Sequence, residues 1–212
     1  MNQQENMADI VVPGIPPHIL LMCWGAGGSI LFNIVYFAFG AVTPNYDEMR
    51  QPIGNLELAA HGWIQSTNFI VLGLFVALFA VGLRKELAGG FGATALPLLH
   101  FLTAFGLILM GIFVREPAHT FVSLFSFFSI LISFLLFARR LSGDPRWEDW
   151  TAFTNICAVL MLVLMVIFWY ADDTEGAYAG VFERMLEITR LVWSIVFMLK
   201  LLDGRRLKTP GG

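Results

Sequence analysis

Apolar residues in this 212-residue chain gather in six long runs that are separated by short polar breaks. A run of about 20 apolar residues is long enough to cross the hydrocarbon core of a membrane as an α-helix. We therefore expect an all-α, polytopic membrane protein built as a bundle of six transmembrane helices. The expected spans cover residues 19–42, 62–83, 91–114, 119–138, 151–171 and 181–202.

The breaks between the runs are too polar or too turn-prone to stay in hydrocarbon. Residues 43–61 contain two prolines and several charges, and the segment Ser142-Gly143-Asp144-Pro145 is typical of a turn. Because six spans and short connections use nearly the whole chain, we expect residues 1–212 to form one transmembrane domain with a tail at residues 1–17. The tail has no Lys or Arg, so it lacks the basic start of a secretory signal peptide.

The composition supports a protein that resides in lipid. Hydrophobic residues make up 57% of the chain and charged residues 14%, and the mean hydropathy is +0.71. An ordinary soluble domain is about 25% charged. With a net charge of −3 and scattered bases, the chain offers no basic surface for nucleic acid. Cys23 and Cys157 both lie in apolar runs, where we expect them to be packing residues.

The distribution of Lys and Arg predicts the orientation. For six spans, most bases fall on one side, and basic residues near span ends are retained in the cytoplasm. We therefore expect both termini to be cytoplasmic. The bases on that side are Arg84, Lys85, Arg139, Arg140, Arg146, Lys200, Arg205, Arg206 and Lys208.

Charged residues inside the sixth run are the sharpest chemical signal. Glu183, Glu187, Arg190 and Ser194 share one helical face. Arg190 would lie about 13 Å from the outer end of the helix, at 1.5 Å per residue. A lone arginine at that depth is costly, so we expect it to pair with Glu187. The pair either fixes helix register or belongs to an anion-binding or proton-handling site.

Other polar residues enter the membrane from the same side. His61, Gln65 and Asn68 share a face of the second span, Glu57 precedes it, and His119 begins the fourth. We expect these side chains to converge on an outward-facing polar pocket for a small polar or anionic ligand or a lipid head group. The predicted pocket residues are Glu57, His61, Gln65, Asn68, Glu116, His119, Glu183, Glu187 and Arg190.

Within that pocket, His61, Glu116, His119 and Glu187 form a weak candidate set of nitrogen and oxygen ligands for a divalent metal. His119 and Glu187 are alternatively an acid/base pair near neutral pH. No nucleophile is evident, so the sequence assigns no catalytic residue and no cofactor.

Three expectations concern packing inside the bundle. His100 follows Pro97 by three residues and is expected to bond a carbonyl that the proline leaves free. Small residues near Gly25 and Ser29 indicate close approach of another helix. On the fourth span we expect a polar stripe to face protein and four phenylalanines to face lipid. The stripe is His119, Ser123, Ser126 and Ser133, and the phenylalanines are Phe121, Phe127, Phe128 and Phe134.

Several local elements resemble a known family. They are Pro52-Ile53-Gly54-Asn55-Leu56 before the second span, Glu116 with His119, and Glu183-Arg184 with Trp193. Across most of its length the chain resembles the prokaryotic integral membrane family labelled domain of unknown function 998. The resemblance implies a six-helix bundle in the cytoplasmic (inner) membrane of a prokaryote, and it implies no particular activity or cofactor.

Three classes of function remain open on this sequence. The first is a membrane protein whose outward-facing pocket binds a polar ligand, with membrane lipids as partners. The second is an accessory subunit whose Phe-rich surface contacts other subunits of a larger membrane complex. The third is a metal-dependent or acid/base membrane enzyme that acts on lipid.

Overall fold

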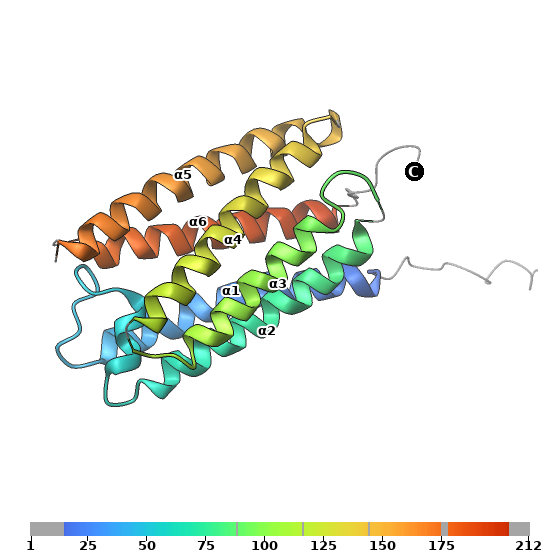
Figure 1. Ribbon diagram of the computed structural model, residues 1–212. Coiled ribbons are helices and arrows are strands. Elements are labelled where there is room, and N and C mark those ends of the chain that lie inside the picture. Colours follow the sequence, from blue (N-terminus) through green and yellow to red (C-terminus); the bar gives the residue numbers. More distant parts are fainter. Residues whose placement is uncertain (1–14, 88, 116, 144, 175–177, 204–212) are drawn as a thin grey trace, which may run out of the picture.

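The computed structural model describes residues 15–87, 89–115, 117–143, 145–174 and 178–203, which form only helices and connecting turns (Figure 1). The predicted all-α fold is therefore confirmed for the described residues. The elements are α1 (Pro17–Val42), η1 (Ile53–Leu58), α2 (Trp63–Glu86), α3 (Ala95–Met110), α4 (Ala118–Leu141), η2 (Pro145–Trp147), α5 (Glu148–Asp173) and α6 (Ala179–Leu202), where η marks a 3-10 helix.

The long helices close a ring. Each one packs against its neighbour in sequence, and α6 returns to pack against α1. Figure 1 shows α4 running obliquely, from beside α3 at the end of the bundle that holds η1 to beside α5 at the other end. We call these ends the η1 end and the opposite end. The ring leaves an interior that side chains of all six helices share.

Four of the described helices, α1, α2, α4 and α5, are long and apolar enough to cross a membrane, as in a multi-pass membrane protein. The other two depart from that pattern for different reasons. Helix α3 is apolar but has 16 residues. Helix α6 has 24 residues, and its first half carries the charged side chains that the sequence singled out.

Helix α3 is shorter at both ends than the predicted span of residues 91–114, so those boundaries were wrong. Before it, Gly90 and Gly92 have φ angles of 78° and 77°, in the left-handed region that favours glycine. The helix ends at Met110, and Gly111 follows as its C-cap. The apolar residues around the helix therefore belong to turns.

The prediction for His100 was wrong about the carbonyl that it bonds. Pro97 cannot donate to the Ala93 carbonyl, and Arg84 Nη1 donates to that oxygen instead, at 3.1 Å. The Nδ1 atom of His100 lies 2.9 Å from the Leu96 carbonyl oxygen, one turn earlier in its own helix. The Arg84 guanidinium, near the end of α2, thus satisfies the Ala93 carbonyl that Pro97 leaves free.

Close approach of α1 and α2 confirms the packing signal near Gly25. A Cβ atom on Gly25 would lie 2.5 Å from the Cβ of Phe79, and one on Gly28 would lie 2.3 Å from the Cβ of Phe75. Both glycines are therefore needed for the two helices to meet at this distance.

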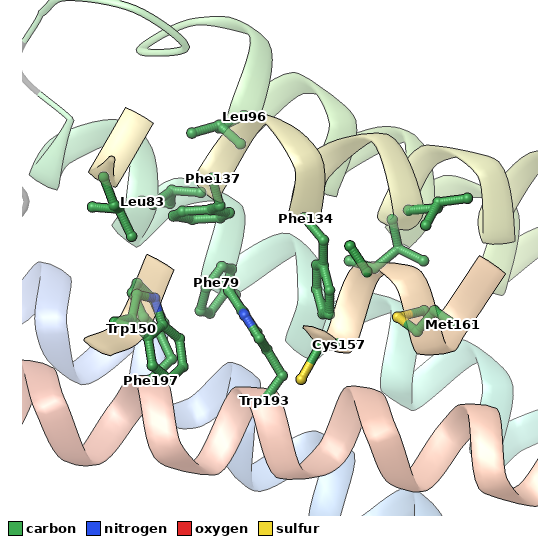
Figure 2. Packing of buried hydrophobic residues seen from close by; sticks show 14 of the residues in the cluster. Phe79, Leu83, Leu96, Phe134, Phe137, Trp150, Cys157, Met161, Trp193 and Phe197 are labelled. Atoms are coloured by element: carbon green, nitrogen blue, oxygen red, sulfur yellow. The ribbon is translucent and has the colours of Figure 1, made fainter. Parts of the chain in front are cut away.

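The opposite half of the bundle has an aromatic core (Figure 2). The Trp193 ring lies 4.4 Å from Phe134 and 5.0 Å from Phe197, measured between centroids. The Trp193 Nε1–H donates to Thr154 Oγ1 at 3.1 Å. Because α4 contacts both α3 and α5, it buries a wide face, and both Phe127 and Phe134 are buried. The prediction that these two face lipid was wrong; exposed Phe121 and Phe128 fit it.

Candidate functional site

The first turn of α6 is fixed by the segment between α1 and α2. Backbone N–H groups of Gly180 and Val181 donate to the carbonyls of Arg50 and Met49, each at 3.2 Å. Free N–H groups at a helix start require such acceptors. The segment therefore satisfies the start of α6 and sets the position of the charged side chains that follow.

Arg184 ties the same segment to α6. Its Nη2 donates to the Tyr46 hydroxyl at 2.7 Å, and its Nη1 donates to the carbonyls of Gln51 and Gly180 at 3.2 and 2.9 Å. The guanidinium also lies 5.7 Å from the centre of the Tyr46 ring. These contacts use Arg184 as a structural clamp.

Glu183 joins η1 to α6 and faces the interior of the bundle. Its Oε2 accepts the backbone N–H of Ile53 at 2.5 Å. The residue is only 6% exposed. A carboxylate can accept about four hydrogen bonds, so one bond to Ile53 leaves acceptor capacity for a second partner.

The predicted pairing of Arg190 with Glu187 is confirmed. Arg190 Nε and Nη2 both donate to Oε2 of Glu187, at 3.0 and 2.5 Å. Its Nη1 donates to Ser29 Oγ on α1 at 3.0 Å. All three side chains are buried. The guanidinium is thus engaged by its own helix and by α1, and this arrangement links two helices that close the ring.

A cavity of about 400 Å³ opens at the η1 end, between η1 and the adjoining ends of α3, α4, α5 and α6. This volume lies within the range of roughly 300–1,000 Å³ that small-molecule sites occupy. Apolar and polar side chains share its wall. The residues that line it are Pro52, Gly54, Asn55, Leu58, Met110, Val114, Arg115, His119, Thr120, Ser123, Phe127, Phe168, Trp169, Asp172 and Glu183.

Two small cavities continue from it toward the middle of the bundle. The first, about 20 Å³, shares Glu183 with the large cavity and reaches Arg190. The second, about 30 Å³, shares Arg190 with the first and reaches His100. Each is large enough for a water molecule, which needs about 10–15 Å³. Glu183, Glu187 and Arg190 of α6 therefore border a series of cavities that share lining residues.

His119 and Glu57 form a contact at the wall of the large cavity. The Nδ1 atom of His119 lies 3.3 Å from Glu57 Oε2 and 3.1 Å from the Phe113 carbonyl oxygen. Glu57 Oε1 accepts from the Ser66 hydroxyl at 2.9 Å. Burial in η1 raises the pKa of Glu57 from an ordinary 4.5 to about 7, and the Ser66 bond partly opposes that rise.

The structure divides the predicted pocket residues into separate groups. His119 and Glu183 line the large cavity, Glu57 lies behind His119, and Glu187 and Arg190 lie deeper. The remaining predicted residues line none of these three cavities or lie outside the described structure. Buried Gln65 and Asn68 bond to each other, His61 is exposed, and Glu116 lies outside the described residues.

The candidate metal ligands are not brought together among the residues that the structure describes. No three of the described His, Cys, Asp or Glu side chains form a group that could hold a metal ion. Of the predicted set, His119 contacts Glu57, and Glu187 is bonded to Arg190. His119 and Glu187 therefore each have a partner other than the one that the predicted acid/base pair requires.

Sequence reasoning missed part of the cavity wall. Asn55, Thr120, Trp169 and Asp172 line the cavity, yet none was among the predicted pocket residues. Asp172 lies in the last turn of α5, on the same side of the bundle as His119, so the six-span topology alone gave a signal for it. The oblique course of α4, which opens the space, has no counterpart in the sequence pattern.

These observations define a helical bundle in which four described helices are long and apolar enough to cross a membrane, with a cavity lined partly by charged residues at one end. The chain belongs to the DUF998 family, whose model is described as "Protein of unknown function" and matches residues 26–200. The predicted family is thus confirmed. No curated protein and no solved structure shows a significant match to the chain.

Proposed function

We propose that this protein is a six-span bundle of a prokaryotic inner membrane that binds a small polar ligand or a lipid head group. In this proposal the η1 end faces outward and both termini are cytoplasmic. The basic side chains near the opposite end, including Arg84, Arg139 and Lys200, support that orientation.

Helices α3 and α6 fit the proposal despite their departures from a simple span. Sixteen residues of α-helix extend about 24 Å, and apolar turns flank α3 at both ends. In α6, Arg190 is paired with Glu187, and Arg184 is bonded to carbonyl groups and a hydroxyl. Pairing of this kind allows charges to lie inside a membrane bundle.

The 400 Å³ cavity is the observation that carries the proposed function. Polar groups from several elements border one space, and apolar side chains from α4 and α5 border the same space. A site with a few polar groups on a largely apolar wall is typical of small-molecule binding.

The position of the cavity favours a lipid. Phe127 of α4 and Phe168 and Trp169 of α5 lie on its wall. Trp169 also contacts exposed Phe128 of α4, with centroids 5.8 Å apart, so the cavity borders the outer surface where α4 and α5 meet. A head group in the cavity would leave its acyl chains beside these rings and in contact with surrounding lipid.

Filling the cavity tests the proposal. We expect Ser123→Phe to lower lipid binding at least about tenfold, because the new ring occupies space that the head group needs. The measurement is native mass spectrometry of the purified full chain with an equimolar mixture of phosphatidylethanolamine, phosphatidylglycerol and cardiolipin. Ser142→Phe, at the exposed far end of α4, is the matched control. Equal lipid binding by both variants and the wild type would show that lipid does not bind in this cavity and would overturn the head-group form of the proposal.

A further inference from the structure

We propose that the head group in this cavity is a zwitterion of the phosphate–amine class, such as phosphoethanolamine, and this inference rests on the proposed function. The cavity has one wall with basic and hydroxyl groups and another with carboxylates. The arrangement of these walls, rather than the net charge of the site, identifies the ligand class.

The phosphate wall comprises Arg115 and the first turns of α4. Arg115, His119, Thr120 and Ser123 all line the cavity. Guanidinium and hydroxyl groups are donors that suit phosphate oxygens, and so is an imidazole whose two ring nitrogens both carry hydrogen. They also lie near the start of α4 at Ala118, where the helix dipole favours negative charge.

Gly54 leaves space beside the Nε2 atom of His119. A Cβ atom at position 54 would lie 2.8 Å from His119 Nε2, so a larger residue would crowd that atom. On the other ring nitrogen, Nδ1 already faces Glu57 and the Phe113 carbonyl. The Nε2 atom is therefore the one that remains for a ligand in the cavity.

The amine wall comprises the lining carboxylates of α5 and α6, whereas the phosphate wall belongs to Arg115 and α4. Asp172 is in the last turn of α5, where the helix dipole favours positive charge. Glu183 contributes a carboxylate that is 6% exposed and that uses Oε2 to accept the Ile53 N–H. An ammonium group supplies three hydrogen-bond donors, which match the acceptor capacity of carboxylates.

Two walls of opposite charge select against ligands that carry a single sign of charge. A purely anionic head group would approach Asp172 and Glu183, and a purely cationic one would approach Arg115. Unfavourable juxtaposition of like charges is an effective source of specificity. A zwitterion of matching polarity avoids both encounters.

Binding of defined probes to the full-length protein in detergent tests this inference. The probes are dihexanoyl phosphatidylethanolamine, its N-acetylated derivative, dihexanoyl phosphatidylglycerol and free phosphoethanolamine, each titrated by calorimetry. We expect phosphatidylethanolamine to bind about three- to tenfold more tightly than either anionic lipid. Free phosphoethanolamine binding as tightly as the lipid would assign the same chemistry to a soluble ligand, whereas tighter lipid binding would assign it to a membrane lipid.

A pair of adjacent acids provides a matched control. Asp172→Asn should reduce the preference for the amine-bearing lipid, whereas Asp173→Asn should leave it unchanged, because exposed Asp173 is not part of the cavity wall. If phosphatidylglycerol binds as tightly as phosphatidylethanolamine and Ser123→Phe still abolishes binding, the zwitterion inference fails while the proposed function stands. If none of the probes binds, and no lipid binds in the native mass spectrometry, the proposed function fails too.

Discussion

The two halves of the bundle use the same six helices for different purposes. At the opposite end, aromatic rings such as Trp150, Trp193 and Phe197 fill the interior, with Trp150 and Phe197 stacked at 5.6 Å between centroids (Figure 2). At the η1 end the interior holds paired charges and a cavity of about 400 Å³. One half is a packed core, and the other half has the features of a binding site.

Helix α6 shows how a single element serves both halves. Its buried face presents Glu183, Glu187 and Arg190 in the first half, and then Trp193 and Phe197. The change takes place within one turn, between Arg190 and Trp193. The aromatic half holds α6 against α4 and α5 while the charged half is kept in position by α1, η1 and the preceding segment. We infer that stability and ligand binding depend on different parts of this face.

Breaking the ion pair should have the largest effect on stability. We expect Arg190→Leu to lower the free energy of unfolding by about 4 kcal/mol, because Glu187 then remains buried without its cation. The double variant Glu187→Met with Arg190→Leu should cost only about 1 kcal/mol, since it removes both charges. Denaturant unfolding in detergent, followed by circular dichroism, measures both changes.

An ion pair at the surface of the opposite end is the control for this experiment. Lys200 contacts Asp149, whose side chain is 62% exposed. Lys200→Met should change stability by less than about 1 kcal/mol. If Arg190→Leu has no greater effect than Lys200→Met, the charged half does not hold the bundle together in the way that its geometry indicates.

Trp193→Ala tests the aromatic half and should have the next largest effect. We expect a loss of about 3 kcal/mol in unfolding free energy, because the change leaves a void beside Phe134 and Phe197 and removes the bond to Thr154. Trp63→Ala is the control, since Trp63 is 67% exposed. Below its unfolding temperature the Trp193 variant should retain lipid binding. Loss of binding in the folded variant would show that the two halves are coupled.

The sequence predicted the helices well because apolar runs of spanning length produce a strong local signal. The predicted starts and ends lie within a few residues of the helices for five of the six spans, including α2 (Trp63–Glu86). The exception was α3, because residues 91–94 and 111–114 on either side of it carry no charge and continue its apolar run. The φ angles of 78° and 77° at Gly90 and Gly92 keep the segment before α3 out of the helix, and hydrophobicity does not report them.

The candidate site was only partly predictable, for a geometric reason. Helical spacing correctly placed Glu187 beside Arg190, since both residues belong to one helix. Contacts between helices depend on crossing angles, which left His61 exposed and brought Glu57 to His119 instead. The hydrogen bond from Arg190 of α6 to Ser29 of α1 likewise could not be predicted from helical spacing, because it joins two helices far apart in the sequence.

Titration of Glu57 should have the smallest of the three effects on stability. It tests whether the η1 end of the bundle, unlike the aromatic half, makes stability depend on pH. With a pKa of about 7 in the folded protein and an ordinary value of 4.5, Glu57 binds more protons when folded throughout the window between those values. The unfolding free energy should therefore fall as the pH rises from 4.5 to 7.

The full shift in pKa would correspond to about 3 kcal/mol, and we expect about 2 kcal/mol because solvent in the adjacent cavity can relax around the carboxylate. Glu57→Gln should remove this part of the pH dependence, measured by unfolding at a series of pH values. Glu148→Gln, at an exposed position beside the aromatic half, should retain it. An equal pH slope in the wild type and in Glu57→Gln would mean that this carboxylate titrates normally and that its burial against Ser66 and His119 does not affect its charge. A reduced slope in Glu57→Gln alone would place the pH-sensitive group behind the His119 wall of the cavity, where its charge can reach a bound phosphate.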